Sequence, residues 1–297
     1  MAAAALTFAV VAISSLAPDW VASPDGQLGL SYGVAAASLY AQRHRHRFVA
    51  VTHPSAGPEA AGKRLEWARN SQIQQLFSSS ADESGAPVLD CQVDYAFWLE
   101  SDAWITNLTV PLQQLVAAGA AARGDGAAPE MIINRDAAGN LNTGTGLIRC
   151  SAAGLRMLQR MDEIRYSHAN DRKLVMWGAN GAAVRAPHPC AALWISRRCL
   201  LTCMHAPSAA HLCLPQMVMH RDAEYAKDMA FVSAKLLNAY PLPDMAACAG
   251  DTCRDVYWSP GDFVVHFAGH SPKAPSYRRF LERYPPDTWP GYDTVAP

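Results

Sequence analysis

Short apolar runs and segments with helical spacing alternate along the first part of the chain. Residues 6–13 form a continuous apolar run, which is typical of a short strand buried on both faces. Residues 30–43 combine helical spacing with good helix formers, and residues 47–52 return to strand character. A strand, a helix and a strand in this order predict a β-α-β unit, which implies parallel strands joined by a right-handed crossover.

The same alternation continues to about residue 165. A polar stretch at 78–87, made largely of serine, glycine and proline with two acids, predicts a loop. Beyond residue 166 the pattern weakens until a final strand over 262–267 and a proline-rich tail. The sequence therefore predicts an α/β protein with a mostly parallel central sheet flanked by helices. We expect further helices over 62–77, 110–122 and 151–165, and further strands over 94–99, 131–134 and 141–150.

Composition and charge describe an ordinary globular chain. With 297 residues, half of them hydrophobic, it can bury a substantial core as one large domain or two small ones. Its 25 basic residues are balanced by 26 acidic ones, so it lacks the basic excess of a protein that binds nucleic acid through phosphates. The dense basic run at 43–47 lies between a helical and a strand-like pattern, and we interpret it as a solvated helix end.

The N-terminal residues 1–19 have no basic region, and their apolar run is too short to cross a bilayer. A signal peptide is an open alternative, but we favour a first buried strand there. No other stretch is long and apolar enough to be a transmembrane helix, so we expect no membrane span.

Eight cysteines are present, and six of them lie in residues 190–253. The cysteines and histidines between 199 and 213 are close together, but their spacing matches none of the strong zinc patterns. Disulfides would suit an oxidising compartment, and buried free thiols would suit the cytosol. The sequence leaves both alternatives open.

An acidic pair, Glu100 and Asp102 with Ser101 between them, follows the predicted strand at 94–99. In open parallel sheets ligands bind beyond the carboxyl ends of the strands, so a ligand is expected at this pair. Hard carboxylate oxygens suit Mg²⁺ or Mn²⁺ together with phosphate oxygens. The alternative is an acid that caps the next turn, and the pair alone does not decide between the two.

His266 interrupts the apolar strand of GDFVVHFAGH, residues 261–270. A histidine in such a strand is most often a core histidine satisfied by one hydrogen bond. The turn that follows contains Gly269, where backbone can approach a ligand closely, so a third metal ligand is the functional alternative.

The segment LNTGTGLIRC, residues 141–150, places Asn142 before Gly144 on a glycine-rich bend. Short polar side chains and exposed amides on such a bend would suit sugar hydroxyls. A plain β-turn is the alternative, because asparagine and glycine are common turn formers.

Taken in order along the chain, several segments share a pattern: YAQRH (40–44), WAR (67–69), WLESDAWITN (98–107), LNTGTGLIR (141–149), NAYP (238–241) and GDFVVHFAG (261–269). This series resembles the GT-A-fold glycosyltransferases that include galactomannan α-galactosyltransferases, xyloglucan α-xylosyltransferases and yeast-type α-mannosyltransferases. The last segment is the most specific. The resemblance spans nearly the whole chain, and residues 166–215 have no counterpart.

The resemblance implies a Rossmann-like GT-A fold in a single domain over residues 1–297. A nucleotide-binding half would extend to about residue 107, and an acceptor-binding half would cover 108–297. The implied reaction is metal-dependent transfer of a hexose or pentose from a UDP- or GDP-sugar to a glycan hydroxyl, with retention of the α configuration. A front-face mechanism, in which the departing phosphate assists the acceptor hydroxyl, would need no carboxylate nucleophile.

The same resemblance implies roles for individual residues. Glu100, Asp102 and His266 would hold Mn²⁺ (or Mg²⁺) against the nucleotide diphosphate, with Asp102 as the indispensable ligand. Gln216 would lie near the anomeric carbon. Further contacts to the donor or substrate are expected from Ser14, Arg69, Ser101, Asn142, Gly144, Gly269 and Lys273.

Two other classes of function compete with this one. A degenerate transferase that binds a nucleotide sugar or glycan without turnover would explain Glu100 in the acidic motif, Arg69 in place of a lysine, and the missing acid before Gln216. A two-metal phosphohydrolase would need more carboxylates and histidines than the sequence shows.

Family relatives are anchored in the Golgi lumen, so the compartment is the Golgi lumen if an anchor was removed, and the cytoplasm otherwise.

Overall fold

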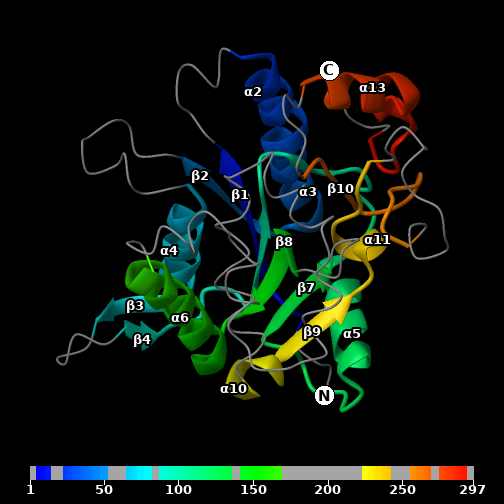
Figure 1. The fold of residues 1–297 in the computed structure, drawn as a ribbon. Helices are drawn as coiled ribbons and strands as arrows, with labels where there is room; N and C mark the ends of the chain where they lie inside the picture. The colour runs from blue at the N-terminus through cyan, green and yellow to red at the C-terminus, as the bar shows by residue number, and fades with distance from the viewer. Residues whose placement is uncertain are drawn as a thin grey trace, which may run out of the picture.

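A computed structural model describes residues 5–14, 23–52, 65–81, 87–135, 141–168, 223–241, 255–268 and 274–292. Its central feature is a six-stranded sheet in the order β2-β1-β5-β8-β7-β9 (Figure 1). In this sheet β8 runs antiparallel to both of its neighbours, and the other pairs are parallel. The predicted mostly parallel sheet is therefore confirmed. The strands are β1 (Phe8–Ser14), β2 (Arg47–Thr52), β5 (Tyr95–Leu99), β7 (Met131–Arg135), β8 (Leu141–Arg149) and β9 (Met229–Val232).

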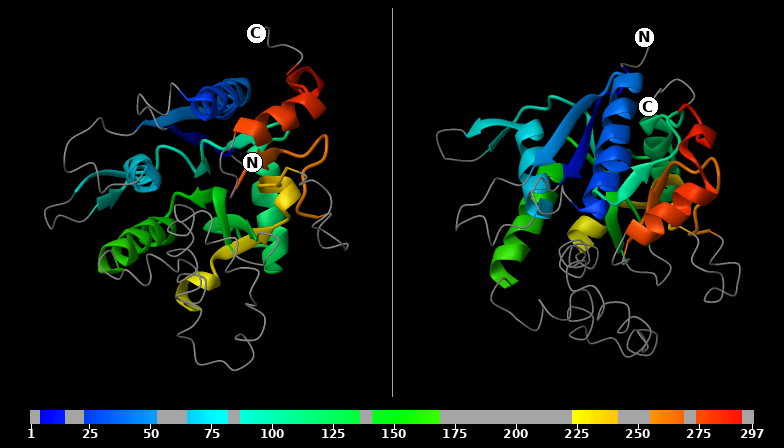
Figure 2. Two further views of the ribbon diagram at one scale, coloured as in Figure 1. Left: turned by 45° about the horizontal axis from the view of Figure 1, so that its top comes forward. Right: turned by 90° about the horizontal axis from the view of Figure 1, so that it is seen from above.

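Helices cover both faces of this sheet. One face carries α3 (Ala35–His44), which continues the π-helix Gly29–Val34, and α5 (Leu112–Arg123). The other face carries α4 (Leu65–Phe77) and α6 (Ala152–His168), which lie side by side in both views of Figure 2. The short α2 (Pro24–Leu28) precedes the π-helix. The helices predicted over 30–43, 62–77, 110–122 and 151–165 are confirmed, with ends that differ by a few residues.

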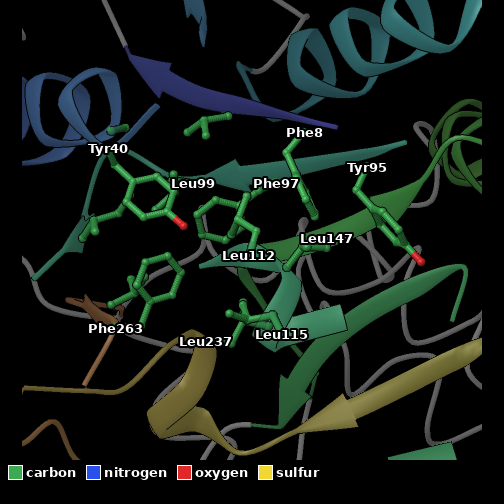
Figure 3. Close-up of a cluster of buried hydrophobic side chains, with 14 of the residues drawn as sticks. Phe8, Tyr40, Tyr95, Phe97, Leu99, Leu112, Leu115, Leu147, Leu237 and Phe263 are labelled. Carbon is green, nitrogen blue, oxygen red and sulfur yellow. The ribbon is translucent and has the colours of Figure 1, made fainter. Parts of the chain in front are cut away.

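Strand β5 shows why the sheet forms where it does. All five of its residues are buried, and their side chains alternate between the two faces. Phe97 and Leu99 pack with Tyr40 and Leu112 on the α3 and α5 face (Figure 3). Trp98 faces the α4 and α6 side. A strand that is buried on both faces must be apolar at every position, which explains the continuous apolar run in the sequence.

A second, two-stranded sheet lies next to the first. It pairs β6 (Ala103–Ile105) antiparallel with β10 (Val264–His266), and His266 is opposite Ala103. Figure 1 shows β10 between α3 and the short helix α11 (Ala234–Leu237). The strand predicted at 262–267 is confirmed in this smaller sheet.

The proline-rich tail expected at the end of the chain is wrong for residues 274–283. They form α13 (Ala274–Arg283), which is followed by the 3-10 turn η4 (Pro286–Thr288). Tyr277 and Phe280 are spaced three residues apart and pack on the buried ring of Trp104. Pro275 lies in the first turn of α13, where a missing N–H costs no helical hydrogen bond. The prolines therefore do not prevent a helix here.

The loop predicted at 78–87 is also wrong in part. Residues at its two ends form the antiparallel strands β3 (Ser78–Ala81) and β4 (Pro87–Leu89). This pairing uses backbone groups, and Pro87, which has no N–H to donate, is tolerated as the first residue of an edge strand, so the side chains gave no strand signal. Strand β9 and the helices α11 and α10 (Ala223–Ala226) are too short to have been distinguished in the weak pattern beyond residue 166.

Cys91 and Cys150 form a disulfide that joins the segment before β5 to the end of β8. The other six cysteines, including those of the rejected zinc pattern, lie outside the described residues. Among the described helices, none combines the length and the apolar character needed to span a membrane.

Candidate metal and donor site

The candidate site lies where the parallel strands of the main sheet end. Ala12 of β1 is opposite Leu99 of β5, so Ser14 lies at the same edge as the acidic pair. Because β8 runs in the opposite direction, it begins at this edge, and its Thr145 is opposite Leu99. One edge of the sheet therefore gathers Ser14, Glu100 and Asp102, and the Asn142 segment, as expected for a ligand site in an open α/β sheet.

The acidic pair lies on a tight turn between β5 and β6. The Glu100 N–H donates to the carbonyl of Gly144 on β8 (2.8 Å), and the Ala103 N–H donates to the Glu100 carbonyl (3.0 Å). Gly33 leaves room for the turn, since a Cβ on Gly33 would lie 2.8 Å from the Ser101 carbonyl oxygen. The turn thus carries the chain out of the main sheet and into the second one.

Strand β10 brings His266 to this turn. The Phe267 N–H donates to the Asp102 carbonyl (2.9 Å), and the His266 N–H donates to the Ala239 carbonyl (2.7 Å). As a result, Nε2 of His266 lies 3.4 Å from Oδ1 of Asp102 and 3.8 Å from Oε2 of Glu100. The histidine side chain is only 4% exposed, whereas Glu100 keeps 16% of its side chain exposed.

These three residues fit a divalent cation. One ligand atom from each lies within 4.8 Å of the others. In octahedral coordination two ligand atoms, each about 2.1 Å from the ion, are about 3.0 Å apart when they subtend a right angle at the ion and about 4.2 Å apart when they lie on opposite sides of it. The distances of 3.4 Å and 3.8 Å from Nε2 of His266 to the two acids lie between these limits. Nδ1 of His266 is buried and has no hydrogen-bond partner among the described residues. Any polar contact of the imidazole with the acids is therefore made through Nε2, the nitrogen that faces Asp102 and Glu100.

Asn142 and Gly144, expected to contact sugar, lie in a bonded network beside His266. Oδ1 of Asn142 accepts from the Gly144 N–H (3.1 Å), and its Nδ2 donates to the Tyr240 hydroxyl (2.6 Å). The ring of Tyr240 is nearly parallel to the imidazole of His266, at 23° and with 6.2 Å between centroids. Sequence reasoning missed Tyr240 as a site residue, although it lies in the NAYP segment that carried part of the resemblance.

The glycine-rich segment is part of a strand and is not a separate turn. Residues 141–149 all belong to β8, which pairs without interruption with β5 over residues 145–149. Against β7 the register shifts between Ile132 and Asn134, so β8 bulges over residues 143–146. The strand predicted over 141–150 is therefore confirmed as the bulged β8, and the alternative of a plain β-turn is wrong, because the pairing with β5 continues over residues 145–149.

Arg69 is buried in α4, with 2% of its surface exposed. Its guanidinium lies over the ring of Trp98, 5.1 Å from the centroid, and its Nε donates to Oδ1 of Asn70 (3.3 Å). A cation–π contact of this kind suits arginine better than lysine, because a planar guanidinium can stack on an aromatic face. Trp98 is two residues before Glu100 on the same strand.

Asp262, in the segment that carries the strongest resemblance, has a structural role. Its carboxylate accepts from the Ser259 N–H (2.7 Å) and lies 3.7 Å from the Lys235 ammonium. Burial raises the pKa of Asp262, while the Ser259 hydrogen bond and Lys235 oppose that rise. Asp262 therefore closes the turn that leads into β10 and so helps to place His266.

The remaining expected site residues are only partly placed. Ser14 and Ser101 have described backbones at the site edge. Gln216, Gly269 and Lys273 lie outside the described residues. Asn107, which begins a formal glycosylation sequon, is buried and donates through Nδ2 to the Gly261 carbonyl (2.7 Å).

No protein-family model and no curated protein sequence matches the chain. Several solved structures that are similar to it in fold are glycosyltransferases. A glycosyltransferase involved in the glycosylation of the major capsid of PBCV-1 is 13% identical, with a TM-score of 0.49 over 93% of this chain and 99% of that one. The galactosyltransferase LgtC, solved with donor and acceptor sugar analogues, is 12% identical over 97% of both chains, with a TM-score of 0.41. Mouse xyloside xylosyltransferase 1 is 10% identical over 89% of this chain and 98% of that one, with a TM-score of 0.38.

Proposed function

We propose that this protein is a metal-dependent glycosyltransferase that moves a sugar from a nucleotide-sugar donor to a glycan hydroxyl. The observation that carries the proposal is the convergence of Glu100, Asp102 and His266 at the carboxyl edge of the sheet. The ordered series of sequence segments supports it, because those segments contain all three residues and lie next to one another in the fold. The substrates follow from the resemblance: a UDP- or GDP-sugar as donor and a glycan as acceptor.

The chemistry of transfer explains why such a cation group would be needed. A departing nucleotide diphosphate accumulates negative charge, and a divalent cation bound to these residues would neutralise that charge without a proton transfer. The protein would supply the orientation: Glu100 and Asp102 are fixed by the backbone bonds of the turn, and His266 by the pairing of β10. A departing phosphate that assists the acceptor hydroxyl would then give retention without a carboxylate nucleophile.

Within the group we propose unequal roles for the two acids. Asp102 is closer to His266, and its own carbonyl accepts from the residue after that histidine. Glu100 has one more methylene and is more exposed, so it would tolerate a contact through water. Ser14, Ser101, Arg69, Gly269 and Lys273 are proposed to contact the donor, and Gln216 to lie near the anomeric carbon. The division into a nucleotide-binding half up to about residue 107 and an acceptor-binding half over 108–297 is also part of the proposal.

The test is a panel of UDP- and GDP-sugars, each assayed for donor hydrolysis and for transfer in the presence of Mn²⁺, Mg²⁺ or EDTA. We expect metal-dependent turnover of at least one donor, and loss of that turnover in Asp102→Ala. Asp287→Ala is the matched control, because Asp287 is an exposed acid on η4. Absence of both binding and hydrolysis across the panel would refute the proposal. Calorimetric donor binding with no turnover on any acceptor would select the degenerate binding protein.

A further inference from the structure

Gly144 lies directly against the imidazole ring of His266. A Cβ added to Gly144 would be 2.1 Å from Cε1 of that ring and 2.6 Å from each ring nitrogen. Gly144 is not among the residues with positive φ in the described chain, so its backbone conformation is open to any residue. Space alone therefore requires glycine at this position, and the ring occupies that space.

The backbone of Gly144 also bonds to a second member of the metal group. Its carbonyl accepts from the Glu100 N–H (2.8 Å), and its own N–H donates to Oδ1 of Asn142 (3.1 Å). One residue of the β8 bulge is thus bonded to the backbone of Glu100 and in contact with the side chain of His266. A shift of Gly144 would change the separation of these two candidate ligands.

Tyr240 links the other side of the Asn142 amide to the same histidine. Nδ2 of Asn142 donates to the Tyr240 hydroxyl (2.6 Å), and the tyrosine ring is nearly parallel to the imidazole. Both polar ends of the Asn142 side chain are therefore bonded within the protein, and the residue is only 5% exposed. The amide keeps one N–H and one lone pair, but burial leaves them little access to a sugar hydroxyl.

We propose that Asn142, Gly144 and Tyr240 are positioning residues that hold the imidazole of His266 with Nε2 toward Glu100 and Asp102. We call these three residues the histidine holder. The inference rests on the proposed function, because it takes His266 to be a metal ligand. It replaces the expected sugar contacts of Asn142 and Gly144 with an action through His266. These residues act on the imidazole by packing, and a ligand whose rotamer is locked by packing is pre-organised for the cation.

The first experiment measures Mn²⁺ alone by isothermal titration calorimetry. Gly144→Ala should weaken Mn²⁺ binding about 10- to 100-fold, the usual loss when an orienting partner of a metal ligand is disturbed. Gly146→Ala is the matched control: it adds the same methyl on the same strand, but its Cβ would lie 2.3 Å from the Trp98 ring. We expect Gly146→Ala to lower stability without this loss of affinity. Equal affinity of Gly144→Ala and the wild-type protein, or equal losses in the two glycine variants, would overturn the inference.

The second experiment needs no metal and applies even where Gly144→Ala folds poorly. If the added methyl strains the protein through the imidazole, Gly144→Ala should lower the melting temperature less in a His266→Ala background than in the wild-type protein. Equal losses in both backgrounds would overturn the contact. Together the two experiments distinguish failure of the proposed function from failure of the histidine holder. A wild-type protein that binds no Mn²⁺ refutes the proposed metal function, whereas an additive cycle refutes the histidine holder.

Tyr240→Phe tests the hydroxyl apart from the ring. The variant keeps the ring beside His266 and removes the hydroxyl that accepts the Asn142 hydrogen bond. We expect weaker Mn²⁺ binding than in the wild-type protein, but stronger binding than in Gly144→Ala. Unchanged Mn²⁺ binding would remove Tyr240 from the histidine holder.

Discussion

Replacing Asp102 with asparagine should separate a metal site from an internal ion pair. The variant has nearly the same shape, but it removes one of two carboxylates whose ligand oxygens lie within 4.8 Å of each other and of Nε2 of His266. At that separation two negative charges repel by about 3.5 kcal/mol for an effective dielectric constant near 20. If the two acids form an empty metal site beside a neutral His266, replacing one of them relieves this repulsion. Metal-free Asp102→Asn should then be at least as stable as the wild-type protein.

The response to metal should change in the opposite sense. A cation at 100 times its dissociation constant stabilises a folded protein by about 2.7 kcal/mol. For a chain of 297 residues the unfolding entropy is about 0.6 kcal/mol/K, so this corresponds to a rise in Tm of roughly 4 °C in the wild-type protein, and we expect Asp102→Asn to lose most of it.

The assay is thermal unfolding with EDTA and with a series of Mn²⁺ concentrations, for the wild-type protein, Asp102→Asn and the exposed control Asp287→Asn. A protonated His266 paired with Asp102 at 3.4 Å would give the reverse pattern in EDTA, because the variant would lose that attraction. Clear destabilisation of the metal-free variant, together with an unchanged rise in Tm on adding Mn²⁺, would refute the metal site.

Three further predictions concern stability. The disulfide between Cys91 and Cys150 closes a loop with a sequence separation of 59, for which chain entropy predicts about 4 kcal/mol. Cys91→Ser, at an exposed position, should lower the free energy of unfolding in urea by about 2–4 kcal/mol, and a loss below about 0.5 kcal/mol would contradict the assigned bond. Burial and the nearby His44 lower the pKa of His46 to about 4, below its unfolded value, so stability should fall as pH drops from about 6.5 toward 4. Because His46 is partly exposed, this loss should be roughly 1–2 kcal/mol, and a His46→Gln variant with the same pH dependence would refute it. Phe280→Ala should lower the free energy of unfolding in urea by about 3–5 kcal/mol. A much smaller loss would show that Phe280 and Tyr277 of α13 pack loosely on Trp104.

Strand β5 and its acids could be predicted from sequence because a strand buried on both faces leaves an unbroken apolar run, and Glu100 ends that run. The direction of β8 could not be predicted, since apolar residues such as Leu147 recur with the same period in either direction. The residues alone left His266 as either a core histidine or a third metal ligand, and the resemblance favoured the second, because no local pattern links Asp102 to a residue so far along the chain. The helix at 274–283 was missed because prolines were given more weight than the spacing of its aromatic residues.

The glycines of β8 show a second limit. Gly144 and Gly146 indicated a bend, and the sequence contains no sign of which side chains would lie over them. The structure shows that the imidazole of His266 and the indole of Trp98 occupy those places. A glycine can be needed because a neighbouring side chain fills the space of its Cβ, or because its own backbone has a positive φ. The two cases can be told apart only when the neighbouring side chain is known.

The pairing of β6 with β10 has a consequence for the order in which the protein is made. During synthesis β6 emerges early, whereas β10, its partner in the two-stranded sheet, follows about 160 residues later. At ribosomal rates this is a delay of roughly 8–30 s, during which the strand after Asp102 has no edge to pair with. The turn with Glu100 and Asp102 therefore reaches its final pairing only after the C-terminal part of the chain has been made. A nascent chain interrupted before His266 would contain the two acids without the third residue of the metal group.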